Sequence, residues 1–180
     1  MMNNKVYAFE TDTVWGLGAD IKSEISIRKI YELKHRENTK PLILMSWGLE
    51  AILPYIEPLN TEVQKIAEKY LPGALTIIVK KSKKFPKYLN PEFDTVGIRI
   101  PNHTGFQNFC KANNLVLATT SANISSEAPC ENANEVKEKF SGHVEIIKTT
   151  ILGKNSQTPS TIILMQDKGF KVLREGNIKF

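Results

Sequence analysis

The sequence has few of the residues that commonly bind metals or form disulfide bridges. It contains two cysteines and three histidines in 180 residues. Cys110 and Cys130 lack a metal-ligand spacing, and two thiols do not make a disulfide framework. The histidines are scattered, and Ser121 has no obvious base partner in the sequence. We therefore predict no protein-bound metal, no nucleophilic triad, and two reduced, partly buried thiols.

Long apolar runs and the usual nucleotide-binding loops are also missing. No apolar stretch approaches the 18 or so residues of a membrane span, and no signal peptide precedes the first strand-like run. We therefore expect a cytoplasmic protein with no membrane partner. No Gly-x-x-x-x-Gly-Lys-Ser/Thr loop and no Gly-x-Gly-x-x-Gly element occurs, which argues against a standard P-loop or dinucleotide-binding fold.

Composition and charge suit a globular protein with an anionic ligand. The chain is 41% hydrophobic and 24% charged, without repeats or a linker, so we expect one domain over residues 1–180. A net charge of +5 favours nucleotides, pyrophosphate or nucleic acid as ligands. The densest basic run, residues 80–87, is best explained as a solvated loop after a strand. A contact with RNA through this surface is the alternative.

Apolar periodicity predicts alternating strands and helices. Helices are expected at Glu24–Lys34, Thr61–Leu71, Gly105–Ala112 and Asn134–Phe140. Strands are expected at Val6–Phe9, Leu42–Met45, Leu75–Val79, Val96–Ile100, Leu115–Ala118, Val144–Ile147, Thr161–Met165 and Phe170–Leu173. This irregular alternation is typical of an α/β protein with a mixed sheet and helices packed on it. The polar loop Ile151–Ser160 is the best candidate for a mobile segment.

Two cations close to the end of the first helix form a candidate phosphate site. Lys34 and Arg36 lie in the segment Lys34–Pro41, where the helix is expected to stop. Lysine supplies a compact charge and arginine a bidentate fork, and both are used to bind polyphosphate. The alternative is a simple charge pattern, because cations are favoured at helix C-termini.

An arginine interrupts an apolar strand. Arg99 lies between Ile98 and Ile100, so the alternation of a strand places its side chain on the opposite face. Burying a charge is costly unless it is paired or faces a ligand, which makes Arg99 a candidate ligand contact. The alternative is an exposed face of the sheet.

Two polar segments follow predicted strands. Glu10–Gly18 holds hydroxyls, carboxylates and glycines, and either a ligand site or an ordinary capped turn explains it. Ala118–Ser126 is rich in hydroxyls, and loops at strand ends commonly carry the ligand contacts of α/β proteins. Pro72-Gly73, in contrast, is fully explained as a turn between a helix and a strand.

In order along the chain, these segments resemble the YrdC-like family of threonylcarbamoyl-AMP synthases, in its short, single-domain form. The family's motifs are matched, from the N-terminus onward, by the residues Thr11-Asp12-Thr13-Val14-Trp15-Gly16-Leu17, Lys34-His35-Arg36 with Pro41-Leu42, Pro72-Gly73-Ala74-Leu75-Thr76, Val96-Gly97-Ile98-Arg99-Ile100-Pro101, Ser121-Ala122-Asn123, Ser160-Thr161-Ile162 and Leu173-Arg174-Glu175-Gly176. Each match is weak alone, but their order is specific. Glu10, Trp15, Ser126 and Cys130 depart from the residues usual in the family at these positions.

The resemblance implies a twisted, open mixed sheet that encloses a basic cavity, and it implies a reaction. L-threonine, bicarbonate or CO₂, and ATP with Mg²⁺ would give threonylcarbamoyl-AMP and pyrophosphate, for the modification of adenosine 37 in tRNA with the help of partner proteins of the transfer step. By the same resemblance, threonine would be held by Thr11, Arg99 and Ser160, with Arg99 on its carboxylate. ATP would be held by Lys34, Arg36, Thr95, Thr119, Ser121, Asn123, Cys130 and Arg174, and Lys34 and Arg36 would be the catalytic cations.

Two other functions remain open at this point. A YrdC-like module that binds RNA without catalysis would use the same positive charge. A carbamoyl-adenylating enzyme acting on another amine or acid would use the same site.

Overall fold

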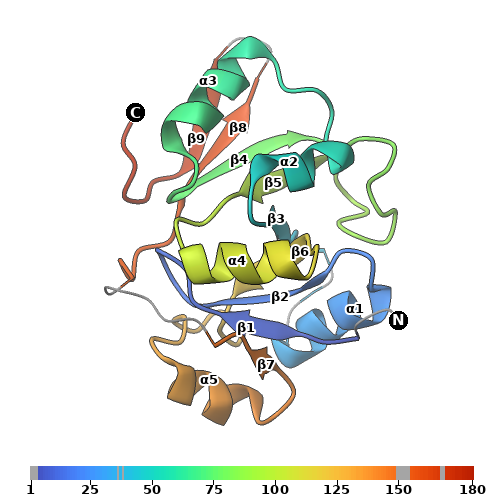
Figure 1. The fold of residues 1–180 in the computed structure, drawn as a ribbon, viewed down its shortest axis with the longest axis vertical. Helices are drawn as coiled ribbons and strands as arrows, with labels where there is room; N and C mark the ends of the chain where they lie inside the picture. The colour runs from blue at the N-terminus through green and yellow to red at the C-terminus, as the bar shows by residue number, and fades with distance from the viewer. Residues whose placement is uncertain (1–3, 36, 38, 149–154, 167–168) are drawn as a thin grey trace.

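The fold is a mixed sheet with helices packed against it (Figure 1), as the sequence predicts. The computed structural model describes residues 4–35, 37, 39–148, 155–166 and 169–180. In this part of the chain the strands form one sheet in the order β7-β1-β2-β6-β3-β5-β4-β8-β9. The strands are β1 (Tyr7–Phe9), β2 (Gly16–Asp20), β3 (Ile43–Met45), β4 (Leu75–Lys80), β5 (Thr95–Arg99), β6 (Leu117–Ser121), β7 (Glu145–Ile146), β8 (Thr161–Met165) and β9 (Phe170–Arg174).

Parallel and antiparallel pairs alternate irregularly across this sheet. Strands β3 and β5, β4 and β8, and β1 and β7 run parallel, whereas the other neighbours are antiparallel. The pairing brings together residues that are far apart in sequence, such as Met45 and Arg99 on β3 and β5. The central strands therefore assemble one surface from the middle and both ends of the chain.

Strand β2 is missing from the sequence-based prediction, which treats Glu10–Gly18 as a turn. Glycine disfavours strands because it has no side chain to pack, and β2 contains Gly16 and Gly18. The ring of Phe9 on β1 occupies the place of their missing side chains. An added Cβ would lie 2.8 Å from this ring at Gly16 and 3.0 Å from it at Gly18. The glycines thus let an aromatic ring cover the neighbouring strand.

The segment after Leu115 also differs from the prediction. The expected strand Leu115–Ala118 is shifted toward the C-terminus, because β6 continues through Thr119 and Thr120 to Ser121. All three polar residues pair with β2, and Thr119 also pairs with Ile43 of β3. The hydroxyls therefore lie on the sheet itself and not in a loop beyond it.

Four of the five helices in the described part of the chain begin at a side chain that caps their first turn. The helices are α1 (Glu24–Leu33), α2 (Leu49–Ile52), α3 (Thr61–Tyr70), α4 (Thr104–Ala112) and α5 (Ala133–Phe140), with a 3-10 turn at Leu53–Tyr55. Ser23, Asn60, His103 and Asn132 accept hydrogen bonds from backbone N–H groups at the starts of α1, α3, α4 and α5. The prediction missed α2, which is a single turn and too short to show a period.

Alternation along the strands separates a core face from a cavity face. Leu44, Ile77, Ile98 and Ala118 lie in the large hydrophobic core, together with buried residues of α1, α3 and α5. The residues between them in sequence point to the opposite side of the sheet. One end of that side is filled by a second core, in which Phe106 of α4 packs against the ring of Phe9. The rest of that side lines a cavity.

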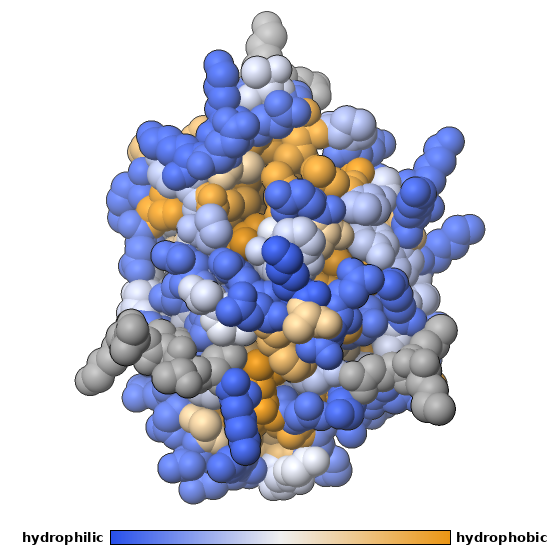
Figure 2. All heavy atoms as spheres, viewed as in Figure 1, coloured by the Kyte–Doolittle hydropathy of each residue, from blue (hydrophilic) through white to orange (hydrophobic). Residues whose placement is uncertain are grey.

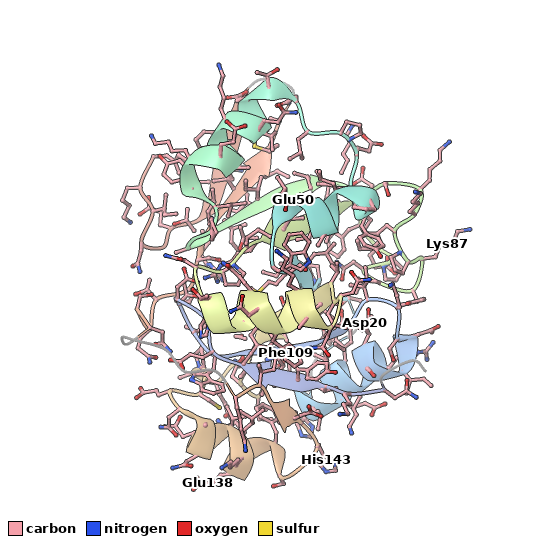
Figure 3. The ribbon with its side chains drawn as sticks, in the orientation of Figure 1. Asp20, Glu50, Lys87, Phe109, Glu138 and His143 are labelled. Carbon is pink, nitrogen blue, oxygen red and sulfur yellow. The ribbon has the colours of Figure 1, made fainter. Side chains whose placement is uncertain are left out.

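The face of the molecule shown in Figure 2 is mostly hydrophilic, with apolar residues visible between the polar ones. In the basic run, Lys81 donates to the carbonyl oxygens of Leu89, Asn90 and Phe93 and so ties its own loop together. Lys83, Lys84 and Lys87 are exposed, and Lys87 points away from the molecule (Figure 3). No helix among the described residues is long and apolar enough to cross a membrane.

Candidate active site

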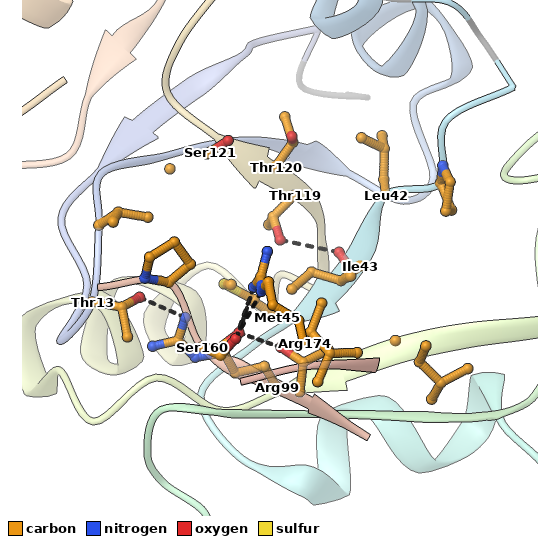
Figure 4. Close-up of a pocket in the computed structure, with 18 of the residues that line it drawn as sticks. Thr13, Leu42, Ile43, Met45, Arg99, Thr119, Thr120, Ser121, Ser160 and Arg174 are labelled. Atoms are coloured by element: carbon orange, nitrogen blue, oxygen red, sulfur yellow. Dashed lines mark hydrogen bonds between the residues drawn. The ribbon is translucent and has the colours of Figure 1, made fainter. Parts of the chain in front are cut away.

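A cavity of about 520 Å³ lies on the open face of the sheet (Figure 4). Strands β2 to β6, β8 and β9 all contribute to its walls. Among the described residues that line it, Arg99 and Arg174 are the only charged ones. Hydroxyl groups from Thr76, Thr119 and Ser121 lie on the same walls. The lining thus combines apolar side chains with two cations and several neutral hydrogen-bonding groups.

Arg99 is the most constrained charge of the cavity. Its side chain is 3% exposed, so the alternative of an exposed sheet face is wrong. Its Nη2 lies 2.6 Å from Oδ1 of Asp12, its Nη1 donates to Oγ1 of Thr13 at 2.7 Å, and its Nε donates to the Gly73 carbonyl oxygen. Burial lowers the pKa of the Arg99 guanidinium, and Asp12 opposes that shift. The guanidinium is therefore fixed in place and remains charged.

The hydroxyls of Thr11 and Thr13 extend this network in one direction. Thr11 Oγ1 donates to the carbonyl oxygen of Val14 at 2.8 Å and accepts from the backbone N–H of Thr13. Because its hydrogen is thus used, its 3.0 Å contact with Thr13 Oγ1 has Thr13 as the donor. Thr13 Oγ1 in turn accepts from Arg99. The Thr11 hydroxyl is therefore saturated within the protein, although the residue lines the cavity.

A second cluster joins β4, β8 and β9. The hydroxyl oxygens of Thr76 and Ser160 are 2.8 Å apart, and both residues are buried. Arg174 donates through Nε and Nη2 to the carbonyl oxygen of Ser160, and Nη2 also lies 3.3 Å from Ser160 Oγ. Burial lowers the pKa of Arg174. Arg174 thus holds Ser160 in a fixed position on the wall of the cavity.

Lys34 lies beneath the β6 end of the cavity and does not line it. The side chain is 1% exposed, and its Nζ donates to the carbonyl oxygens of Ser121 and Asn123 and to Asn123 Oδ1 at 2.5, 2.6 and 2.8 Å. Ser121 Oγ donates to the same Asn123 Oδ1 at 2.6 Å. The three ammonium hydrogens are therefore all engaged, and they shape the turn that follows β6.

Of the remaining predicted site residues, some line the cavity and others do not. Thr95 and Thr119 line it, and Thr119 Oγ1 donates to the Ile43 carbonyl oxygen at 3.1 Å. Cys130 is buried in the large core, where burial raises the pKa of its thiol, and its N–H donates to the Ala122 carbonyl oxygen. Arg36 lies outside the described residues.

The loop before β8 contacts the N-terminal turn. Residues 151–154 of the proposed mobile segment lie outside the described residues, whereas Asn155–Ser160 are described. The N–H groups of Ser156 and Gln157 donate to the carbonyl oxygens of Asp12 and Thr13. Asn155 Nδ2 donates to Glu10 Oε1 at 3.2 Å. Glu10, which departs from the family's usual proline, therefore contributes a hydrogen bond that proline lacks.

Sequence reasoning missed several residues of this site. Asp12 and Thr13 lie within a segment that it singled out, yet their pairing with Arg99 spans 87 and 86 residues of the chain and leaves no local signal. For Thr76, the sequence pattern predicts only an ordinary turn that leads into a strand. The alternation that predicts the direction of Arg99 applies equally to Thr76, which lies between Leu75 and Ile77. This alternation is the signal from which Thr76 could have been predicted to face the cavity.

The described residues contain no group of three or more histidine, cysteine, aspartate or glutamate residues placed to hold a metal ion. No described carboxylate lines the cavity. A magnesium ion bound there would take its oxygen ligands among the described groups from hydroxyls such as that of Ser121 and from backbone carbonyls, with water or a bound polyphosphate supplying the others.

Comparison with curated proteins identifies bacterial relatives over nearly the whole chain. A threonylcarbamoyl-AMP synthase of Pseudoalteromonas atlantica is 33% identical over 160 residues, which cover 88% of this chain and 84% of the relative. One of Actinobacillus pleuropneumoniae is 32% identical over 164 residues, covering 90% and 88% of the two chains.

Solved structures share the fold. P. abyssi Sua5 complexed with L-threonine superposes with a TM-score of 0.86 at 31% identity and covers 96% of this chain. The match covers 51% of the Sua5 chain, so this protein spans about half the length of that relative. E. coli YciO matches with a TM-score of 0.83 at 24% identity, over 96% of this chain and 84% of YciO, and supports the fold alone.

A family model described as telomere recombination, and named after Sua5, YciO and YrdC, matches residues 1–176. It therefore covers all segments that form the cavity. The order of the motifs, the fold and this match agree, and the chain belongs to the Sua5/YciO/YrdC family.

Proposed function

We propose that this protein is an L-threonylcarbamoyladenylate synthase, a nucleotidyltransferase that joins L-threonine, bicarbonate or CO₂, and ATP and releases pyrophosphate. The observation that carries the proposal is the buried Arg99, held on the cavity wall of a chain whose relatives carry this name. A buried, fixed guanidinium in a cavity without described carboxylates selects an anionic group.

Arg99 binds the carboxylate of threonine. A guanidinium has five N–H donors, and Asp12, Thr13 and Gly73 accept three of them. Two donors remain for a ligand that enters the cavity. Ser160 contributes its hydroxyl, whereas Thr11, whose hydroxyl is saturated, contributes its backbone and its support of Thr13.

ATP occupies the space that threonine leaves in the cavity. Thr95, Thr119, Ser121 and Arg174 line the cavity, and Arg174 adds a positive charge. Arg36, in the Lys-x-Arg motif, binds phosphate in this proposal. Lys34 and Asn123 set the shape of the turn after β6, and Lys34 places a buried positive charge beneath it. Cys130 supports the same turn through its bond to Ala122.

The chemistry needs no nucleophilic side chain. The amine of threonine attacks CO₂ derived from bicarbonate, loses a proton, and becomes a carbamate. A carbamate oxygen then attacks the α-phosphorus of ATP, and the bond to pyrophosphate breaks. Arg99 orients the threonine, and Arg36 and Arg174 offset the charge that develops on the phosphates. Mg²⁺ enters with ATP as part of that substrate and is held by its phosphate oxygens.

The product is a reactive mixed anhydride and has to pass to an acceptor. We propose that partner proteins of a transfer step use it to modify adenosine 37 of tRNA in the cytoplasm. The exposed lysines of the loop between β4 and β5 are a second surface, on which RNA could be bound directly. A purely RNA-binding role does not use the two remaining N–H donors of Arg99, and we therefore favour catalysis.

Pyrophosphate release tests the proposal. Purified protein with ATP, Mg²⁺ and bicarbonate is expected to release pyrophosphate when L-threonine is added and not before. Omission of bicarbonate from degassed buffer is expected to suppress the release. Release that is independent of threonine, or none from folded protein, refutes the assignment. Tight, salt-sensitive RNA binding without any effect of threonine supports the RNA-binding alternative.

A further inference from the structure

The hydroxyl pair of Thr76 and Ser160 has one hydrogen more than it uses. The two oxygens are 2.8 Å apart, and one hydroxyl donates to the other. Whichever of them donates, the hydrogen of the other hydroxyl has no acceptor among the described residues. Thr76 is 1% exposed and Ser160 is 3% exposed, and both line the cavity. A buried donor without a partner is costly. We therefore expect an oxygen atom of a ligand to accept this hydrogen.

The pair lies next to Arg99 on the same face of the sheet. In the β4–β5 ladder, Ile77 lies opposite Ile98 and Ile78 opposite Gly97. Continuing this register by one residue places Thr76 opposite Arg99. Directly opposed residues have Cβ atoms about 4.5–5.5 Å apart. An amino acid whose carboxylate is on Arg99 therefore brings its Cβ substituents into reach of Thr76 and Ser160.

Packing fixes the orientation of both hydroxyls. The methyl group of Thr76 lies against Gly97, where an added Cβ would be 3.0 Å from it. The two donors of Arg174 hold the carbonyl oxygen of Ser160 from the other side. A hydroxyl pair that is held on two sides can distinguish a hydroxyl from a methyl group at a fixed point in the cavity.

We propose that Thr76, together with Ser160, selects the amino-acid substrate by hydrogen bonding to the β-hydroxyl of L-threonine. This inference rests on the proposed function and assigns a specificity role to Thr76. The substrate hydroxyl accepts the surplus hydrogen of the pair. An amino acid without this hydroxyl leaves that donor buried and unpaired, which is the kind of difference that allows strong discrimination.

The test compares L-threonine with L-2-aminobutyrate, which keeps the carbon chain and lacks the hydroxyl. We expect the wild-type protein to prefer threonine by at least about 100-fold in kcat/KM for pyrophosphate release. Thr76→Val replaces the hydroxyl by a methyl group of similar shape, and we expect it to reduce this preference by about 10-fold or more. Thr76→Ser keeps the hydroxyl and is expected to retain most of the preference for threonine.

The ratio between the two substrates separates recognition from structural damage. A loss of packing lowers kcat/KM for both amino acids by the same factor and leaves their ratio unchanged, which would overturn the proposal. Thr104→Val, at the exposed start of α4, serves as the matched control and is expected to leave the ratio as in the wild type. If the wild-type protein releases no pyrophosphate with threonine, the proposed function fails. If the wild-type protein releases pyrophosphate with threonine, and Thr76→Val prefers threonine over L-2-aminobutyrate as strongly as the wild type, only the specificity role of Thr76 fails.

Discussion

Replacing Arg99 with glutamine is expected to weaken threonine binding by about 100-fold or more while ATP binding changes by less than about three-fold. The carboxylate loses two charge-assisted hydrogen bonds, each of about 1.5 kcal/mol or more. ATP keeps its contacts, because the proposed arrangement assigns none of them to Arg99. Calorimetric titration of each ligand into the same preparation measures both effects.

Asp12→Asn is the matched control for this variant. Arg99→Gln also breaks the partly buried ion pair with Asp12, whose Nη2–Oδ1 distance is 2.6 Å. Asp12→Asn removes the charge of that partner and keeps the guanidinium, so threonine binding is expected to fall much less than in Arg99→Gln. An equal loss of threonine and ATP binding in Arg99→Gln contradicts the assignment of Arg99 to threonine alone.

The second large effect concerns the stability contributed by Lys34. We expect Lys34→Met to lower the free energy of unfolding by about 3–5 kcal/mol, because three oxygen atoms lose a buried donor. The turn after β6 then loosens, and threonine-dependent pyrophosphate release falls with it. Urea denaturation measures the stability, and Lys65→Met on the exposed face of α3 is expected to change it by less than about 0.5 kcal/mol.

This experiment also distinguishes two roles for the same lysine. The sequence resemblance assigns Lys34 to ATP binding and catalysis, whereas the structure places its ammonium group against Ser121 and Asn123. A variant that is as stable as the wild type and has lost only its affinity for ATP would show that Nζ contacts phosphate directly. A large loss of stability supports a positioning role beneath the site.

The sequence predicted the parts of the fold that depend on local pattern. The strand around Arg99 was predicted from its alternation, and the burial of Ile98 on the opposite face confirms this direction. The helix before Lys34 ends at Leu33, close to the predicted end. In these cases the period of apolar residues and the local stop signals contain the required information.

Features that depend on distant partners were not predictable in this way. Strand β2 was missed because its glycines are compensated by the ring of Phe9 on a neighbouring strand. The extent of β6 depends on two flanking strands that hold polar residues in place. The burial of Lys34 depends on carbonyl oxygens 87 and 89 residues away. Cross-chain contacts of this kind leave no periodic trace near the residue itself.

In the proposed function, the cavity joins three substrates into one adenylate. Incubation with ¹³C-bicarbonate, L-threonine and MgATP, followed by mass spectrometry, tests this claim most directly. The account predicts a product that contains threonine, AMP and one ¹³C atom, together with an equal amount of pyrophosphate. A threonyl adenylate without ¹³C, or AMP and pyrophosphate without any threonine adduct, would contradict it.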